Sequence, residues 1–273
     1  MARIVGGLGI PHNPNFPELV SREGKGCETA ESYARAADAL SIWRPDLLLI
    51  FTTDHLNTFF FENLPLLAIG VGDEFAGPND EAPMVKRCSV PSHPAMGCHL
   101  YAHLVDAGFD LAPIQEFEVD HSVMVPLHFL GQGTPVIPIF VSTHQSIRPS
   151  ARRCFMLGEC IRAAIESFAA SLRVVVVGSG SFSFDVHGPL SPVGRAAGVP
   201  DPAWMQRVRK LLELGAVDQL INEATPERFR RAGNVSGELL NWIAMLGGIG
   251  KAKLDWVRSE PQFGNCYAAW SPQ

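Results

Sequence analysis

The sequence predicts an α/β fold in which a mostly parallel or mixed central sheet is flanked by helices, with a helical C-terminal part. Two observations lead to this prediction. Short apolar runs typical of strands buried on both faces alternate, as far as about residue 180, with segments whose apolar residues have helical spacing. The chain has 273 residues, a hydrophobic fraction of 47% and no internal repeat or low-complexity linker. We therefore expect residues 1–273 to form a single domain.

The clearest apolar run is Leu47 to Phe51, which predicts a buried strand that ends in the polar cluster Thr52 to His55. Residues 28–43 have helical spacing, and a first strand is expected over residues 2–9. Together they form a β-α-β unit, which favours parallel pairing with a right-handed crossover. Ligands of open α/β sheets bind beyond the carboxyl ends of the strands, so His55 is well placed for chemistry.

His12 has a similar placement, because it follows the first strand in the loop Pro11-His12-Asn13-Pro14. An ordinary histidine in a surface loop is the alternative. His121 is preceded by acidic residues and followed by an apolar run. It is either an acid/base group whose tautomer a carboxylate fixes, or a helix-start histidine capped by Asp120.

The remaining elements follow from the same patterns. Residues 72–93, rich in Gly, Pro and acidic residues, predict a long exposed loop, and residues 260–267 are expected to fold back over the pocket. The loop Gly178 to Phe184 matches neither a nucleophile elbow nor a phosphate-binding loop, which disfavours a serine hydrolase or a nucleotide enzyme. Further strands are expected over residues 66–71, 135–141 and 172–177, and helices over residues 94–107, 150–170, 202–215 and 237–246.

Composition excludes several classes of partner. A net charge of −6 without a basic block argues against nucleic acids and anionic membranes, and no apolar run is long enough for a membrane span. The N-terminus runs directly into a strand pattern, so we expect no signal peptide. Six scattered cysteines indicate reduced thiols, and we expect a cytoplasmic protein.

His12, His55 and Glu238 together have the composition of a facial triad, two histidines and one carboxylate. Such a site suits Fe(II) and leaves three coordination positions on one face for a substrate and dioxygen. Taken singly each residue is a weak signal, and Glu238 in a first helical turn also fits a residue that complements the helix dipole.

Several local patterns resemble the class III extradiol dioxygenase family, in particular catalytic β subunits of the protocatechuate 4,5-dioxygenase type. The similarity covers nearly the whole chain, and its most specific block is Pro149 to Ser167. The other matching patterns are the first strand with His12, Thr53-Asp54-His55, Asn63 to Gly70, Val119-Asp120-His121, Val125-Pro126-Leu127, Val136-Ile137-Pro138, Gly188-Pro189 and Gly237-Glu238-Leu239.

The resemblance implies a single catalytic domain that binds Fe(II) through His12, His55 and Glu238. It implies cleavage of a small catechol-like substrate by O₂ next to its hydroxyl groups, in a homo-oligomer or in a complex with a small helical α subunit. We place Asn57, Ser181, Phe184 and Asn265 around the substrate.

The chain departs from the family pattern at one position. Where the family has Gly-x-Gly-x-x-Ser-His, this sequence ends in Ser183-Phe184, so the expected acid/base histidine is a phenylalanine. Either His121 or His187 takes over the proton transfer, or the substrate or chemistry differs, or the chain is a weakened or regulatory paralogue. Retention of all three metal-ligand residues argues against the last alternative.

Two rival functions use the same residues. Zinc also accepts two histidines and a glutamate with water as the fourth ligand, which would make the protein a hydrolase or lyase. A non-catalytic partner subunit is the second rival, and it would bind no metal.

Overall fold

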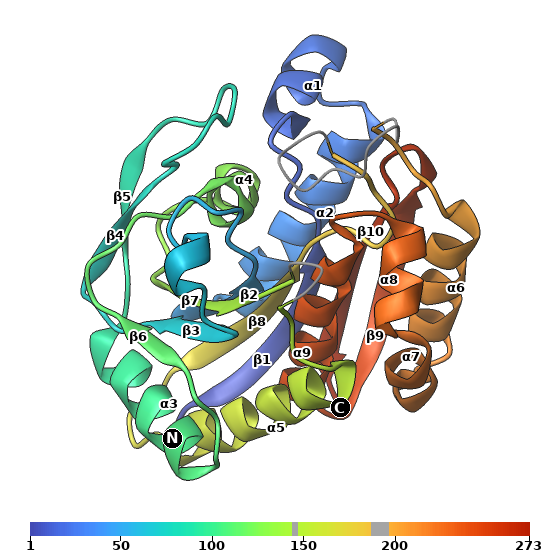
Figure 1. The fold of residues 1–273 in the computed structure, drawn as a ribbon. Coiled ribbons are helices and arrows are strands. Elements are labelled where there is room, and N and C mark those ends of the chain that lie inside the picture. Colours follow the sequence, from blue (N-terminus) through green and yellow to red (C-terminus); the bar gives the residue numbers. More distant parts are fainter. Residues whose placement is uncertain (144–146, 187–196) are drawn as a thin grey trace.

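The computed structural model describes residues 1–143, 147–186 and 197–273. An eight-stranded sheet runs through the molecule in the order β6-β3-β7-β2-β8-β1-β10-β9 (Figure 1). Its strands are β1 (Arg3–Ile10), β2 (Leu47–Thr52), β3 (Leu67–Gly70), β6 (Ala112–Ile114), β7 (Val136–Val141), β8 (Arg173–Ser179), β9 (Ala252–Glu260) and β10 (Asn265–Pro272).

The centre of this sheet is parallel and its flanks are mixed. Strands β7, β2, β8 and β1 pair parallel with one another, whereas β3 pairs antiparallel with β7 and β10 pairs antiparallel with β1. The parallel strands follow crossover helices, as a β-α-β arrangement requires. The predicted fold class, a single α/β domain with a mixed central sheet, is confirmed.

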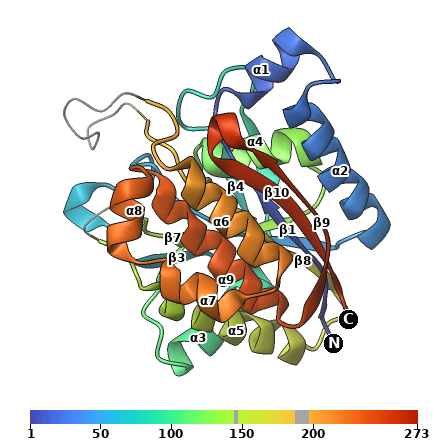
Figure 2. The ribbon, with the colours of Figure 1, turned by 90° about the vertical axis from the view of Figure 1, so that its right-hand side faces the viewer.

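Helices cover both faces of the sheet (Figures 1 and 2). One face packs mainly against α2 and α4, and the other against α5 and α9. The α-helices are α1 (Phe16–Glu23), α2 (Glu28–Trp43), α3 (Pro94–Asp106), α4 (His121–Leu130), α5 (Ala151–Ser167), α6 (Pro202–Glu213), α7 (Val217–Glu223), α8 (Pro226–Ala232) and α9 (Leu239–Ile249). Within the described residues, no helix has both the length and the apolar character needed to cross a bilayer.

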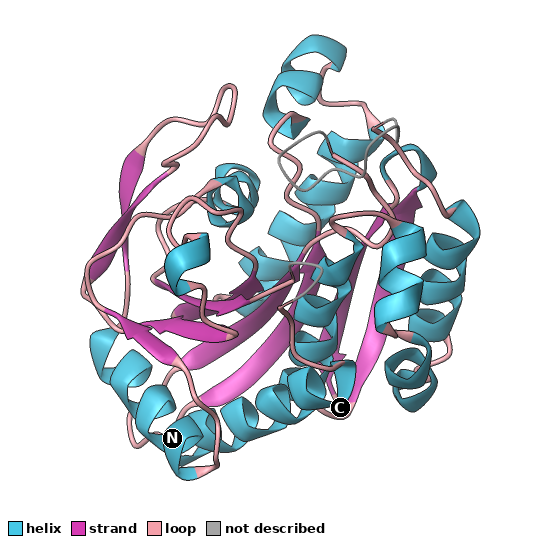
Figure 3. Cartoon of the chain, viewed as in Figure 1, coloured by secondary structure: helices cyan, strands magenta, loops and turns pink. Residues whose placement is uncertain are grey.

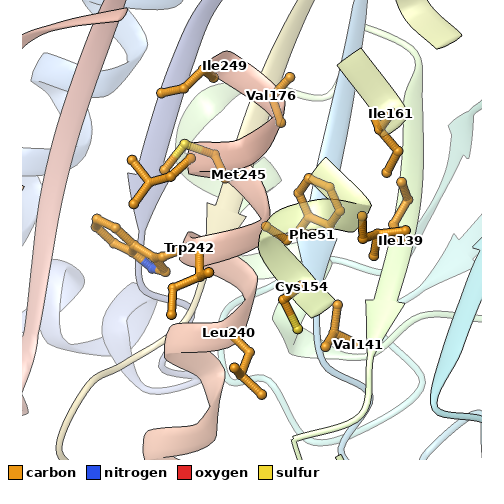
Figure 4. Close-up of a cluster of buried hydrophobic side chains, with 14 of the residues drawn as sticks. Phe51, Ile139, Val141, Cys154, Ile161, Val176, Leu240, Trp242, Met245 and Ile249 are labelled. Atoms are coloured by element: carbon orange, nitrogen blue, oxygen red, sulfur yellow. The ribbon is translucent and has the colours of Figure 1, made fainter. Parts of the chain in front are cut away.

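The face under α5 and α9 forms a large apolar core (Figure 4). Val176 of β8 and Phe51 of β2 lie against Gly248 of α9, and Trp242 of the same helix packs on Gly9 of β1; the three side chains are buried. This burial is the main favourable term that holds α9 on the sheet. It therefore also fixes the start of α9, whose N-cap residue is Glu238.

Two segments differ from the sequence-based expectation (Figure 3). Residues 72–93, expected as an exposed loop, contain a small antiparallel pair, β4 (Glu74–Gly77) and β5 (Cys88–Pro91). The C-terminal part is not only helical, because β9 and β10 extend the main sheet and carry residues 260–267 into it. Both pairs are antiparallel connections between partners near in sequence. Strands β4 and β5 have only four residues each, and β9 is only partly buried, so these three strands lack the continuous apolar runs used for prediction.

Helices α5 and α9 approach each other closely at two glycines. A Cβ at Gly158 would lie 2.0 Å from the carbonyl oxygen of Ala244, and one at Gly247 would lie 2.1 Å from that of Phe155. Neither distance leaves room for a methyl group, so these positions set the distance between the helices.

The substitution Gly247→Ala is expected to lower the free energy of unfolding by about 1–3 kcal/mol, because overpacking forces the two helices apart. The matched control is Gly133→Ala, where an added Cβ meets no atom within 4 Å. Thermal unfolding of both variants checks this expectation. Equal melting temperatures for the two variants would contradict the tight α5–α9 contact.

Candidate metal centre

The candidate ligands lie at the carboxyl end of the parallel strands. His12 follows β1, His55 follows β2, and β8 lies between these two strands in the sheet. Glu238 precedes α9 in a short 3-10 turn, η2 (Ser236–Glu238). Asn241 of α9 donates a hydrogen bond from Nδ2 to the Ser179 carbonyl oxygen at 2.8 Å, which anchors this turn over the end of β8.

Three side chains distant in sequence converge at this end. Nε2 of His55 lies 3.2 Å from Oε1 of Glu238, and Nε2 of His12 lies 3.4 Å from the same oxygen. His12 and Glu238 are buried, at 3% and 2% exposure, and His55 is partly buried. The structure therefore brings together the three residues that the sequence analysis selected as metal ligands.

The outer partners of the two imidazoles determine which nitrogen carries a lone pair. The Ser179 hydroxyl can donate to the Ser122 carbonyl oxygen at 3.4 Å, which leaves it to accept from Nδ1 of His12 at 2.8 Å. Nδ1 of His55 donates to Oδ2 of Asp120 at 2.9 Å. With both Nδ1 atoms protonated, both neutral rings direct an Nε2 lone pair toward Glu238.

Nε2 of His12, Nε2 of His55 and Oε1 of Glu238 are three acceptors that face one another. They repel unless a proton or a cation lies between them. Nε2 of His12 is buried and has no partner with hydrogen-bond geometry among the described residues, despite its 3.4 Å separation from Glu238. An unpaired buried acceptor is costly. A divalent cation bound by two imidazoles and a carboxylate removes this cost, so the donor set fits a metal ion.

The electrostatics of the carboxylate point the same way. Burial alone would raise the pKa of Glu238, but the adjacent His12 and His55 outweigh it and hold the pKa well below its usual range. Burial lowers the pKa of His12 and so favours its neutral, ligating form. Burial also acts to lower the pKa of His55, but the carboxylates of Asp120 and Glu238 raise it well above the ordinary value. The centre thus holds an ionised carboxylate beside imidazoles.

The glycine-rich loop after β8 allows this approach. Gly180 has φ +147°, and a Cβ there would lie 2.4 Å from Cβ of Glu238. The next backbone N–H, that of Ser181, donates to Oε2 of Glu238 at 2.8 Å. The small residues of this loop predict that another group approaches its backbone closely. In the structure, the side chain of Glu238 is that group.

Asp120→Asn is expected to weaken metal binding by roughly 10–100-fold, the usual cost of losing an outer partner of a ligating histidine. Oδ2 of Asp120 accepts the His55 N–H groups, at 2.8 Å for the backbone and 2.9 Å for the ring, and Oδ1 accepts the Ser122 N–H. An amide has only one acceptor oxygen, so it cannot serve both sides. Competition with a chelating fluorophore measures the affinity. Asp201→Asn is the control, because Asp201 also caps a helix but lies on α6. Equal affinities would contradict the role of Asp120.

His121 lies beside the two histidine ligands. Its ring stacks on that of His55 with centroids 4.4 Å apart and an interplanar angle of 25°, and the His12 ring lies 5.7 Å away. The sequence analysis left two readings open, a histidine whose tautomer a carboxylate fixes and a helix-start histidine capped by Asp120. Helix α4 does begin at His121 with Asp120 as its cap, and Nδ1 of His121 also pairs with a carboxylate, that of Asp80. Asp120 itself holds His55. Asp80 was missed because it is 41 residues away, in a segment expected as loop.

Two overlapping groups have ligand atoms within 4.8 Å of one another: His12, His55 and His121, and Asp80, Asp120 and His121. The second is less suited to a cation, because both carboxylates already accept N–H donors from histidines. The first group includes Nε2 of His12, which lacks a hydrogen-bond partner among the described residues and lies 3.4 Å from Oε1 of Glu238. The chemistry of the donors therefore makes His12, His55 and Glu238 the better candidate site for a metal ion.

A cavity of about 560 Å³ opens onto these residues. A wider cleft of about 760 Å³ lies beside the start of β1, and none of the candidate ligands lines it. Of the predicted pocket residues, Ser181 and Phe184 line the cavity, whereas Asn57 and Asn265 do not. His187 lies outside the described residues. The apolar side chains of the lining are Pro14, Leu56, Phe184, Val186, Ala197 and Val235.

The two asparagines have other positions. Asn57 donates from Nδ2 to Oδ2 of Asp120 at 3.3 Å, so it contacts the partner of His55 rather than the cavity. Asn265 is fully buried at the start of β10, and neither atom of its amide has a hydrogen-bond partner in the structure. The tail was expected to fold back over the pocket. In the structure, Asn265 instead begins strand β10 of the main sheet.

Comparisons with known proteins agree with this geometry. The family model described as the catalytic LigB subunit of aromatic ring-opening dioxygenase matches residues 6–268. The chain belongs to the LigB family. The resemblance to class III extradiol dioxygenases noted from sequence motifs is thereby confirmed.

Similar members carry names that specify a substrate. The 2,3-dihydroxyphenylpropionate/2,3-dihydroxicinnamic acid 1,2-dioxygenase of Mycobacterium ulcerans is 28% identical over 82% of this chain and 83% of its own length. The Escherichia coli K12 protein of the same name is 28% identical over 87% and 86%. The crystal structure of the uncharacterized protein JW3007 from Escherichia coli K12 has a TM-score of 0.60 at 15% identity and covers 98% of this chain and all of its own. This last similarity supports the LigB-family fold alone.

Proposed function

We propose that this LigB-family protein is a non-heme Fe(II) dioxygenase that opens the ring of a catechol-like substrate with O₂ next to the hydroxyl groups, the extradiol mode. One observation carries the proposal. Two Nε2 atoms, whose partners fix them as lone-pair donors, face one buried carboxylate oxygen within 3.4 Å. The family membership supplies the reaction class.

His12, His55 and Glu238 would hold the iron. When bound, the ferrous ion would supply a Lewis acid that favours ionised substrate hydroxyls and a common binding point for the ring and O₂. Ser179, Asp120 and the Ser181 N–H keep the three ligands in place. This support limits reorganisation when substrate enters.

His121 is the acid/base group in this proposal. It lines the cavity next to both histidine ligands, and its Nδ1 is occupied by Asp80, so its Nε2 is left to accept or return a substrate proton. Phe184 cannot transfer a proton, and its aromatic side chain forms part of the apolar lining instead. We therefore expect a substrate preference shifted away from protocatechuate, toward catechols with a less polar substituent.

Activity of the anaerobically loaded protein tests the proposal. The chain is loaded with Fe(II), mixed with catechols, aminophenols or hydroxylated heteroaromatics, and then exposed to O₂. We expect the yellow absorbance of ring-opened product with at least one catechol and none after loading with Zn²⁺. Hydrolysis of one of these compounds by the Zn²⁺-loaded protein, without O₂ uptake, would overturn the proposal. Cleavage of protocatechuate by the Fe(II)-loaded protein at an unimpaired rate would contradict the shifted substrate preference.

Location and assembly complete the proposal. All six cysteines are unpaired, which suits a reducing compartment, and we propose the cytoplasm. We also propose that the chain assembles as a homo-oligomer or with a small α subunit. Light scattering of the purified chain tests the first assembly, and co-purification from the source cells tests the second.

A further inference from the structure

We propose that Asp80 is a positioning residue that fixes the orientation and the tautomer of His121, so that the unprotonated Nε2 faces the cavity. The consequence for turnover rests on the proposed function, in which His121 transfers the substrate proton. The tautomer itself is a property of the folded chain and is measurable without turnover.

Asp80 contacts His121 twice. Its Oδ1 accepts the backbone N–H of His121 at 2.9 Å, and its Oδ2 accepts Nδ1–H of the ring. The two contacts hold both the start of α4 and the imidazole plane. The side chains are mostly shielded from solvent, at 14% exposure for Asp80 and 12% for His121, so water does not readily replace the carboxylate. A carboxylate is only an acceptor when ionised, so Nδ1 must carry the proton and Nε2 the lone pair.

The loop that carries Asp80 is fastened on both sides. The backbone N–H of Asn79 donates to the Val119 carbonyl oxygen at 2.9 Å, two residues before His121 in the sequence. Nδ2 of Asn79 donates to the Asn57 carbonyl oxygen at 3.1 Å, close to His55. Arg87 donates to the Pro78 carbonyl oxygen at 2.9 Å and also pairs with Glu118. These contacts anchor the carboxylate relative to the metal centre, which the placement of a proton-transfer group requires.

No other described acid is available for this role. Asp120 is adjacent to His121 in sequence, but its Oδ2 is occupied by His55 and its Oδ1 accepts the N–H of Ser122 as the cap of α4. Each imidazole of the cluster therefore has its own partner: Ser179 for His12, Asp120 for His55 and Asp80 for His121. The first two partners orient metal ligands, whereas the third orients the ring that is left for substrate.

Asp80→Asn separates positioning from packing, because the amide has nearly the same shape. Its NH₂ group would face Nδ1, which must then accept, and the ring proton would move to Nε2. A wrong tautomer at a proton-transfer histidine typically lowers kcat by about 10²–10⁴-fold. We expect a kcat loss in this range for the iron-loaded enzyme, with KM within about threefold of wild type and iron content unchanged. The control Glu81→Gln makes the same carboxylate-to-amide change at the exposed acid next to Asp80 on the same loop, and it should keep kcat.

Two further measurements make the test decisive. Long-range ¹H–¹⁵N spectra of the diamagnetic Zn²⁺-loaded protein should show His121 protonated at Nδ1 in the wild type and at Nε2 in Asp80→Asn, whether or not the protein cleaves any ring. In a His121→Ala background, Asp80→Asn should cause no further loss of kcat. Three results would overturn the proposal. The first is a His121 tautomer that stays the same in Asp80→Asn, and the second is loss of iron from that variant. The third is a kcat loss on adding Asp80→Asn to His121→Ala that is as large as in the wild type. A tautomer change with no ring cleavage in the wild type would contradict the proposed function and leave the positioning role intact.

Discussion

Glu238→Gln is expected to abolish iron binding while the chain stays folded. The amide keeps the shape of the carboxylate but removes its charge, and it turns either a neutral oxygen or an N–H group toward the Nε2 atoms of His12 and His55. Loss of an outer partner alone costs roughly 10–100-fold in metal affinity. Loss of the charged ligand should therefore weaken Fe(II) binding by at least about 100-fold. Metal analysis after anaerobic loading and gel filtration measures the bound iron.

Glu260→Gln is the matched control, because Glu260 is also a fully buried glutamate but accepts hydrogen bonds from Thr29 and Tyr267, away from the centre. It should retain one iron per chain. His12→Ala and His55→Ala should lose iron as Glu238→Gln does. Stoichiometric iron in all three ligand variants would refute the assignment of the metal centre.

His121→Ala is expected to retain iron and to lower kcat for ring opening by about 10²–10⁴-fold, the usual contribution of a positioned acid/base group. The expectation follows from its place in the cavity wall, with its ring 4.4 Å from that of His55 and its Nδ1 held by Asp80. Steady-state O₂ uptake together with metal analysis measures both quantities. Added imidazole should restore part of the rate, since the cavity left by the substitution can accept it.

His187→Ala decides between the two histidines that the sequence analysis considered. The proposal expects kcat for His187→Ala close to wild type. A large kcat loss in His187→Ala together with a near-normal His121→Ala would assign the proton transfer to His187. Loss of iron from His121→Ala would instead make His121 a ligand.

The metal-ligand candidates were accessible from the sequence because their signals are local. An apolar run that stops at a histidine marks the carboxyl end of a buried strand, and this pattern selected His55 and His12. Glu238 carried no comparable signal of its own, and the family resemblance singled it out. The structure then brought Nε2 of both histidines within 3.4 Å of Oε1 of Glu238.

The outer partners were not accessible in the same way. Asp80 and Ser179 lie 41 and 167 residues from the histidines that they contact, and nothing local distinguishes them from other polar residues. The expected role of Asp120 as cap of the helix that His121 opens was local and is present, but its contact with His55, 65 residues away, was not accessible. The position of Asn265 was missed because residues 260–267 were expected to fold over the pocket, whereas Asn265 begins β10 of the main sheet.

By itself, the sequence determined the α/β class and the central strands and helices, since burial leaves a periodic record along the chain. Strand ends marked His12 and His55 as candidate metal ligands, and the family resemblance added Glu238. Only the tertiary structure decided which acid holds which imidazole, and hence which nitrogen faces the centre. The physical reason is that a hydrogen bond between side chains depends on the separation of two atoms, and that separation is set by how the whole sheet and its helices pack.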